Sequence, residues 1–185
     1  TKVSAALTGC RAIVHLAAAM HTNDRELESV NVEGLLNIVA LAGSQGIQRF
    51  IYASCLGATQ FSTSKYFQTK WQGETMIRTS NFYWTIFRPS LIFGPGSHLM
   101  RALDFSVTKI PFIPVMGSGL NQIQPVSNDD VAACIIQSLY NRDTVQQTYD
   151  LLGPKAYSLT EMLEMAAAGS TASKKPTVKV PLQLG

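Results

Sequence analysis

The sequence predicts an α/β fold built on a parallel sheet, and three observations lead to this class. Short apolar runs typical of buried strands alternate with longer segments in which apolar residues repeat at helical spacing. The 185 residues match the length of one domain. The 46% hydrophobic and 15% charged residues suit a packed core and exclude a disordered or fibrous chain.

The first half of the chain is expected to contain three strands, each with a helix before or after it. Gly9 ends a helix over residues 1–8, and Thr22 or Asn23 can cap the helix that follows the first strand. Pro89 interrupts the third strand because it has no N–H to donate. The predicted elements are a strand over 12–17, a helix from about 24 to 43, a strand over 49–54, a helix over 62–78 and a strand over 84–88.

The second half is predicted to be less regular. Ser158 and Glu161 have the S-x-x-E spacing of a capping box, which predicts the start of a helix that runs to about residue 168. The other elements expected here are a turn at 94–96, a helix over 99–108, a Pro- and Gly-rich irregular stretch over 111–125, and a strand over 148–152. Residues 126–139 hold a predicted helix that Ser127 or Asn128 caps.

Charge and cysteine usage exclude several classes of protein. The net charge is +3, and no basic run is denser than Lys174-Lys175, so we expect no nucleic-acid partner. Cys10, Cys55 and Cys134 lie far apart without ligand spacing, which predicts neither a metal site nor a disulfide and favours a reducing, cytoplasmic location. No apolar stretch reaches the length of a membrane span.

Three side chains could carry chemistry. Tyr66 and Lys70 are four residues apart, so they share one helix face, where an ammonium would lower the pKa of a phenol. A chance pair is the alternative. Ser54 ends a predicted strand, where its hydroxyl could reach a substrate oxygen or simply form a turn. His15 is interpreted as a core residue, and Asn31 as a side chain that holds a neighbouring loop.

The order of these segments resembles the short-chain dehydrogenase/reductase superfamily, in its extended or atypical branch of NAD-dependent epimerase/dehydratase-like proteins. The resemblance covers essentially the whole chain. The matching segments are VHLAA at 14–18, NVEG at 31–34, YFQTK at 66–70, RPSLIFGPG at 88–96, PVSNDDVA at 125–132 and LTEML at 159–163.

The resemblance implies a Rossmann-like sheet that binds NAD or NADP at the carboxyl ends of its strands. Tyr66 would be the general acid/base, Lys70 would lower its pKa and bind the nicotinamide ribose, and Ser54 would polarise the substrate. The implied reaction is that of an NAD(P)-dependent oxidoreductase or epimerase/dehydratase on a small carbonyl or alcohol substrate. The residue that would distinguish NAD from NADP is not expected within this chain.

The same resemblance assigns the cofactor's surroundings. The implied cofactor-binding residues are Leu16, Ala17, Ala18, Tyr66, Lys70, Pro89, Ser90 and Leu91. The single partial domain over 1–185 would include irregular portions of a substrate lobe at about 94–125 and 153–185.

Residues 52–58 and 64–66 are more similar to proteins like the 39-kDa accessory subunit of respiratory complex I. Alignment of this strand also allows Cys55, rather than Ser54, at the position of the catalytic hydroxyl. A thiol is a weak donor. A non-catalytic nucleotide-binding accessory subunit, or an interaction module with a decayed site, is therefore the alternative function.

No glycine-rich phosphate loop occurs in the sequence, and only 14 residues precede His15. We therefore expect an internal fragment of a longer protein, inactive on its own. The strand over 12–17 would then have an unpaired edge, through which the fragment could self-associate.

Overall fold

The computed structural model describes residues 2–109, 113–116, 120–168 and 177–180. The chain divides into two compact units, one of residues 1–89 and 131–151 and the other of residues 90–130 and 152–185. The predicted α/β class is confirmed by the first unit, which contains a four-stranded parallel sheet in the order β1-β2-β3-β8. Its strands are β1 (Ala12–His15), β2 (Arg49–Ala53), β3 (Tyr83–Pro89) and β8 (Gln147–Leu151).

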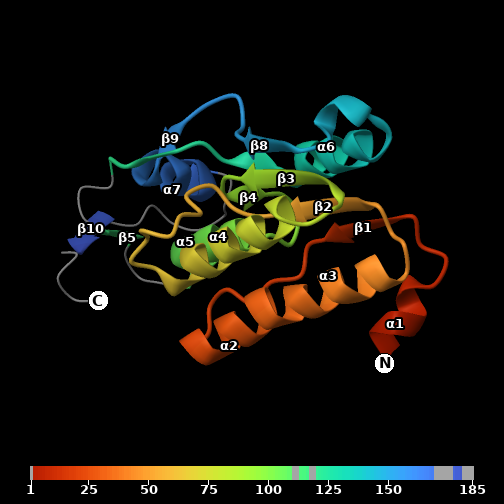
Figure 1. The fold of residues 1–185 in the computed structure, drawn as a ribbon. Coiled ribbons are helices and arrows are strands. Elements are labelled where there is room, and N and C mark those ends of the chain that lie inside the picture. The colour runs from red at the N-terminus through yellow and green to blue at the C-terminus, as the bar shows by residue number, and fades with distance from the viewer. Residues whose placement is uncertain (1, 110–112, 117–119, 169–176, 181–185) are drawn as a thin grey trace. The chain divides into compact units, whose positions relative to one another are not determined.

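Helices cover both faces of this sheet (Figure 1). They are α1 (Lys2–Leu7), α2 (Asp24–Glu28), the π-helix η1 (Ser29–Glu33), α3 (Gly34–Ser44), α4 (Lys65–Arg78), α6 (Asn128–Tyr140) and the short 3-10 helix η2 (Arg142–Thr144). On one face, Leu35 of α3 and Ile77 of α4 pack with Phe50 and Ile86 into a fully buried core. On the other face, the guanidinium of Arg49 donates to the Ser138 carbonyl of α6 at 2.7 Å.

One turn of the helix after β1 is wider than an α-helical turn. The N–H of Gly34 donates to the carbonyl of Ser29, five residues earlier, as a π-helix requires. Asn31 lies within this turn and is only 2% exposed. The wide turn therefore directs a polar side chain inward from an otherwise apolar helix face.

The second unit consists of short strands and two helices. Its elements are β4 (Ile92–Phe93), α5 (His98–Thr108), β5 (Ile113–Met116), β6 (Gln122–Ile123), β7 (Val126–Ser127), β9 (Tyr157–Ser158), α7 (Leu159–Ala168) and β10 (Thr177–Val180). Leu103 of α5 packs with Met162 and Leu163 of α7. The predicted capping box is present, because Glu161 accepts from the Ser158 N–H and the Ser158 hydroxyl accepts from the Glu161 N–H.

Three predictions of local structure need correction. Residues 111–125 are not irregular throughout, because β5 pairs in parallel with β10 and β6 pairs with β9, segments far away in the sequence. The first strand ends at His15, so Leu16 and Ala17 lie in the loop that follows it. Pro89 does not interrupt the third strand but is the last residue of β3, where its carbonyl accepts from the Leu56 N–H at 2.9 Å.

Among the described strands, β1 pairs only with β2, so one of its edges is free. Val14 and Leu16 are 37% and 60% exposed beside this edge. Self-association through it stays a prediction.

Candidate functional site

Lys70 lies at the carboxyl end of the sheet, where α4 passes over β2. Its ammonium donates to the Ala53 carbonyl at 2.6 Å and lies 4.5 Å from the centre of the Tyr52 ring. The residue is 2% exposed. Burial lowers the pKa of Lys70 to about 8, while the charges of Cys55 and Glu74 act in the opposite direction. Lys70 is thus a buried cation with its ammonium at the end of β2.

Tyr66 lies one helical turn before Lys70, and it is half-buried near the thiol of Cys55. Burial raises the pKa of Tyr66 above its ordinary value, and the neighbouring Cys55 raises it further. The expected lowering of this pKa by Lys70 is therefore wrong for this arrangement, in which the Lys70 ammonium bonds to a backbone carbonyl instead. Burial also raises the pKa of Cys55, to about 11, so its thiol is neutral.

Ser54 and Cys55 follow β2, and of the two, Cys55 is the one that acts on the Tyr66 hydroxyl. Ser54 is 5% exposed, and its hydroxyl oxygen is buried without a hydrogen-bond partner. Its N–H donates to the Phe87 carbonyl at 2.7 Å, which continues the pairing between β2 and β3. Which of the two residues holds the position of the catalytic hydroxyl stays a prediction that includes both.

Asn31 ties the loop after β1 to the helix that carries Tyr66. Its amide exchanges two hydrogen bonds with the backbone of Ala19, at 2.8 and 3.0 Å, and donates to the Thr69 hydroxyl at 3.0 Å. Thr69 in turn donates to the carbonyl of Tyr66 at 2.8 Å. The predicted role of Asn31 in holding a neighbouring loop is confirmed by these contacts.

The remaining predicted cofactor residues fall into two groups. Leu16, Ala17 and Ala18 are exposed in the loop after β1, in the same unit as Tyr66 and Lys70. Pro89 ends β3 in that unit, whereas Ser90 and Leu91 belong to the second unit.

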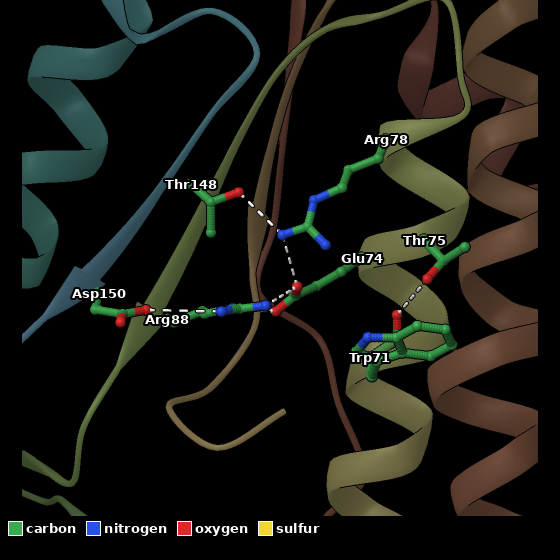
Figure 2. Close-up of polar contacts among 7 residues, drawn as sticks. All are labelled: Trp71, Glu74, Thr75, Arg78, Arg88, Thr148 and Asp150. Atoms are coloured by element: carbon green, nitrogen blue, oxygen red, sulfur yellow. Dashed lines mark hydrogen bonds and ion pairs between the residues drawn. The ribbon is translucent and has the colours of Figure 1, made fainter. Parts of the chain in front are cut away.

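A buried carboxylate one turn beyond Lys70 was not predicted from the sequence. Glu74 is 0% exposed and accepts two hydrogen bonds from Arg88, at 2.7 and 2.6 Å. Arg78 contacts the same carboxylate at 3.0 Å and also donates to Thr148. Figure 2 shows these side chains meeting between α4, β3 and β8, with Asp150 4.0 Å from Arg88. The pairing with Glu74 raises the pKa of Arg88.

This network fixes the helix of the site against two strands. Arg88 stands next to Pro89 at the carboxyl end of β3, and Glu74 stands four residues after Lys70. Two charge-assisted bonds in a fork hold both groups in one geometry. No local pattern in the sequence pairs the two residues, because Glu74 lies on a helix and Arg88 on the strand that follows it.

The side chains at this edge fit one part of a nicotinamide dinucleotide. An ammonium has three N–H donors, and Lys70 uses one on Ala53, which leaves donors for ribose hydroxyls. Leu16, Ala17 and Ala18, which follow β1, are exposed. The turn that would hold the pyrophosphate, with its glycines and helix N-terminus, has no counterpart in the sequence. These residues therefore fit the nicotinamide ribose end of the cofactor.

Comparison with known proteins shows the family to which the chain belongs. Residues 1–142 match a family of NAD(P)H-binding domains, so the chain belongs to that family. Solved epimerase and dehydratase structures share its fold, as the resemblance implied.

Two curated relatives illustrate the range of similar proteins. The chain is 33% identical over 121 residues to the mitochondrial NADH dehydrogenase [ubiquinone] 1 alpha subcomplex subunit 9 of Arabidopsis thaliana, which covers 65% of this chain and 30% of that protein. It is 26% identical over 178 residues to the photosystem II assembly factor Ycf39 of Guillardia theta, which covers 96% of this chain and 55% of that protein. The chain thus spans about a third to a half of these relatives.

A solved structure shows the same fold. The dTDP-glucose 4,6-dehydratase DesIV of Streptomyces venezuelae, determined with NAD bound, matches with a TM-score of 0.84 at 21% identity. The match covers 97% of this chain and 63% of the dehydratase. It confirms the predicted Rossmann-like fold.

Two further predictions meet these findings in part. Within the part of the chain that the structure describes, no helix is long and apolar enough to cross a membrane. The cytoplasmic location stays a prediction, because the Arabidopsis relative is named as a mitochondrial protein.

Proposed function

We propose that the protein carrying this sequence binds NAD or NADP at the Tyr66–Lys70 edge and keeps it as a structural ligand, in the manner of a non-catalytic accessory subunit. Proton transfer is suppressed at this edge. Its partners would then be other protein subunits, a class of partner that the sequence did not suggest.

The burial of Tyr66 near Cys55 carries this proposal. A general acid/base works best when its pKa lies near the working pH. Burial and Cys55 instead raise the pKa of Tyr66, and Lys70 is not among the groups that lower it. A thiol is also a weak donor to a substrate oxygen. The names of the Arabidopsis and Guillardia relatives, a subunit and an assembly factor, suit a role in protein assembly.

A second candidate is the NAD(P)-dependent oxidoreductase or epimerase/dehydratase that acts on a small carbonyl or alcohol. Tyr66 and Lys70 stand one turn apart on α4, and both lie at the end of β2. In this candidate, a substrate oxygen would replace Cys55 as the neighbour of the Tyr66 hydroxyl, and Tyr66 would exchange the proton that accompanies hydride transfer.

Titration of Tyr66 separates the two candidates. Tyrosine labelled with ¹³C at Cζ reports ionisation by NMR, and Tyr66→Phe assigns its signal. We expect Tyr66 to stay neutral up to at least about pH 10 in the nucleotide-bound protein. Titration below about pH 9 would favour proton transfer instead.

Binding is tested separately by the fluorescence of NADH and NADPH. Lys70→Met removes the cation at the ribose and is expected to weaken binding about tenfold or more. Tyr66→Phe keeps the ring and is expected to weaken it far less. Equal affinity of Lys70→Met and the unchanged protein would refute the proposed cofactor edge.

A further inference from the structure

Lys70 is a buried cation that lacks a carboxylate of its own. None of the described carboxylates forms an ion pair with it. Glu74, four residues further along α4, is already bound to Arg88 and Arg78. A buried, unpaired ammonium is costly, so some other group must favour its charged form.

The aromatic ring of Tyr52 lies against the Lys70 ammonium and can favour its charged form. Tyr52 is 1% exposed, and its ring centre lies 4.5 Å from the Lys70 ammonium. A cation at this distance from an aromatic ring is attracted by the electron-rich face of the ring, more strongly when both are removed from water.

Gly73 allows the ring to reach this position. A Cβ built at Gly73 would lie 2.2 Å from the Tyr52 hydroxyl oxygen and 2.8 Å from its Cζ. The hydroxyl oxygen is buried without a hydrogen-bond partner. Because an unpaired buried hydroxyl is unfavourable, the hydroxyl gives no reason for this residue, whereas the contact with Lys70 gives a reason for an aromatic ring here.

We propose that Tyr52 is a positioning residue for Lys70: its ring holds the ammonium at the end of β2 and favours its charged form where no described carboxylate forms an ion pair with it. The role of that charge in binding the cofactor ribose rests on the proposed function. The contact between Tyr52 and Lys70 does not, and it can be tested without any nucleotide.

The other charged and titratable groups around Lys70 come from three elements. His15 of β1 stacks beside Tyr52, with ring centres 5.9 Å apart, and burial and Lys70 lower its pKa to about 4, so it is neutral above that pH. Cys55, after β2, is a neutral thiol with a pKa near 11. Glu74 of α4 also raises the pKa of Lys70, but its carboxylate is already paired with Arg88 and Arg78. The Tyr52 ring is thus the direct contact of Lys70 that favours the cation, apart from the Ala53 carbonyl.

The test replaces Tyr52 with phenylalanine and then with phenylalanines that carry one, two and five fluorine atoms on the ring. These side chains are nearly isosteric, so the fold is retained, while each fluorine weakens the attraction of the ring for a cation. Competitive acetylation followed by mass spectrometry gives an apparent pKa for Lys70 at each step. Lys65 lies on the same helix, is half-buried and forms an ion pair with Glu28. Its labelling serves as the internal reference.

We expect little change for Tyr52→Phe and then a progressive fall in the pKa of Lys70, by about 1 at five fluorines. From a starting value of about 8, that fall would reduce the charged fraction at pH 7 from about nine-tenths to about one half. A pKa that stays constant across the series would overturn the proposal. So would a full fall already at Tyr52→Phe, because the hydroxyl rather than the ring would then be responsible.

Gly73→Ala tests the same contact from the other side. The added methyl group must displace the Tyr52 ring, and the pKa of Lys70 is expected to fall while no charged or polar group is changed. If circular dichroism shows a folded variant whose Lys70 is labelled as in the unchanged protein, the ring is not what holds the cation. If the variant does not fold, the fluorinated series decides alone.

Discussion

The two halves of helix α4 differ in the groups that compensate their buried charges. In the first half, Lys70 is 2% exposed and faces a carbonyl and an aromatic ring. In the second half, Glu74 is 0% exposed and binds two arginines. The two residues are four positions apart and equally removed from water, yet only Glu74 has counter-charges.

The difference separates a part of the helix suited to anchoring from a part suited to binding. Glu74 and Arg88 satisfy each other, so removing either one leaves an uncompensated charge in a buried place. Lys70 and Tyr66 have pKa values that burial shifts away from their ordinary values, which is common at functional sites. Four predictions follow the two halves of the helix, from the largest expected effect to the smallest.

Glu74→Gln is expected to destabilise the folded protein, because Glu74 anchors the second half of α4. The amide keeps the shape of the side chain but leaves Arg88 without its buried counter-charge, at a cost of about 3 kcal/mol in the free energy of unfolding. Urea denaturation followed by circular dichroism measures the loss. Glu33→Gln on the exposed surface is the matched control, and a similar loss in both variants would contradict the anchoring role.

Acid should lower the stability of the folded protein through His15 of β1, which lies beside Tyr52. Its pKa is about 4 in the folded protein, below the ordinary value of 6.5, because of burial and the charge of Lys70. Between these two pH values the unfolded chain binds more protons, so stability falls as the pH falls from 6.5 to 4. After allowance for partial exposure, we expect a loss of about 2 kcal/mol.

His15→Phe provides the control for this acid effect. The variant keeps an aromatic ring beside Tyr52 but has no imidazole to protonate. Its stability should decline less over the same pH range in urea titrations. Parallel curves for both proteins would show that other groups cause the acid effect.

Arg88→Lys and Arg78→Lys sharpen the comparison inside the anchoring half. Arg88 binds both oxygens of Glu74 through a fork, which a lysine cannot reproduce, and we expect a loss of about 1.5 kcal/mol. Arg78 makes one contact with this carboxylate, and its side chain is 34% exposed, so its loss should stay below about 0.5 kcal/mol. Thermal unfolding of the two variants side by side gives the order, and the reverse order would count against it.

Cys55→Ala is expected to have the smallest effect. It removes the thiol near Tyr66, so the pKa of Tyr66 should fall slightly towards its ordinary value while stability changes little. NMR titration of ¹³C-labelled tyrosine detects the change, with Cys134→Ala as the matched control. An unchanged or higher pKa of Tyr66 would show that the thiol does not hold the phenol.

Local patterns in the sequence predicted the sheet well. The apolar runs that begin at Ala12 and Arg49 became β1 and β2, because a buried parallel strand needs a short continuous apolar segment. The role of Asn31 was also accessible, since a polar residue on an apolar helix face must find partners.

Contacts between distant segments escaped the sequence analysis. Glu74 and Arg88 come from a helix and a strand, and nothing local shows that they meet. The strand β5 exists because β10 pairs with it. The choice between Ser54 and Cys55 depends on how the backbone turns after β2, which a single residue of offset reverses.

The π-helical turn η1 constrains the number of residues between α2 and α3. Leu27, Asn31 and Leu35 lie at steps of four residues and are all buried. A regular α-helix advances about 100° per residue, so removing one residue from Ser29–Glu33 would rotate α2 against α3 by about that angle. Leu27 and Leu35 would then face different directions, and Asn31 would lose Ala19. Related sequences should therefore exchange residues in this turn freely while keeping their number constant, so that gaps in an alignment fall outside it.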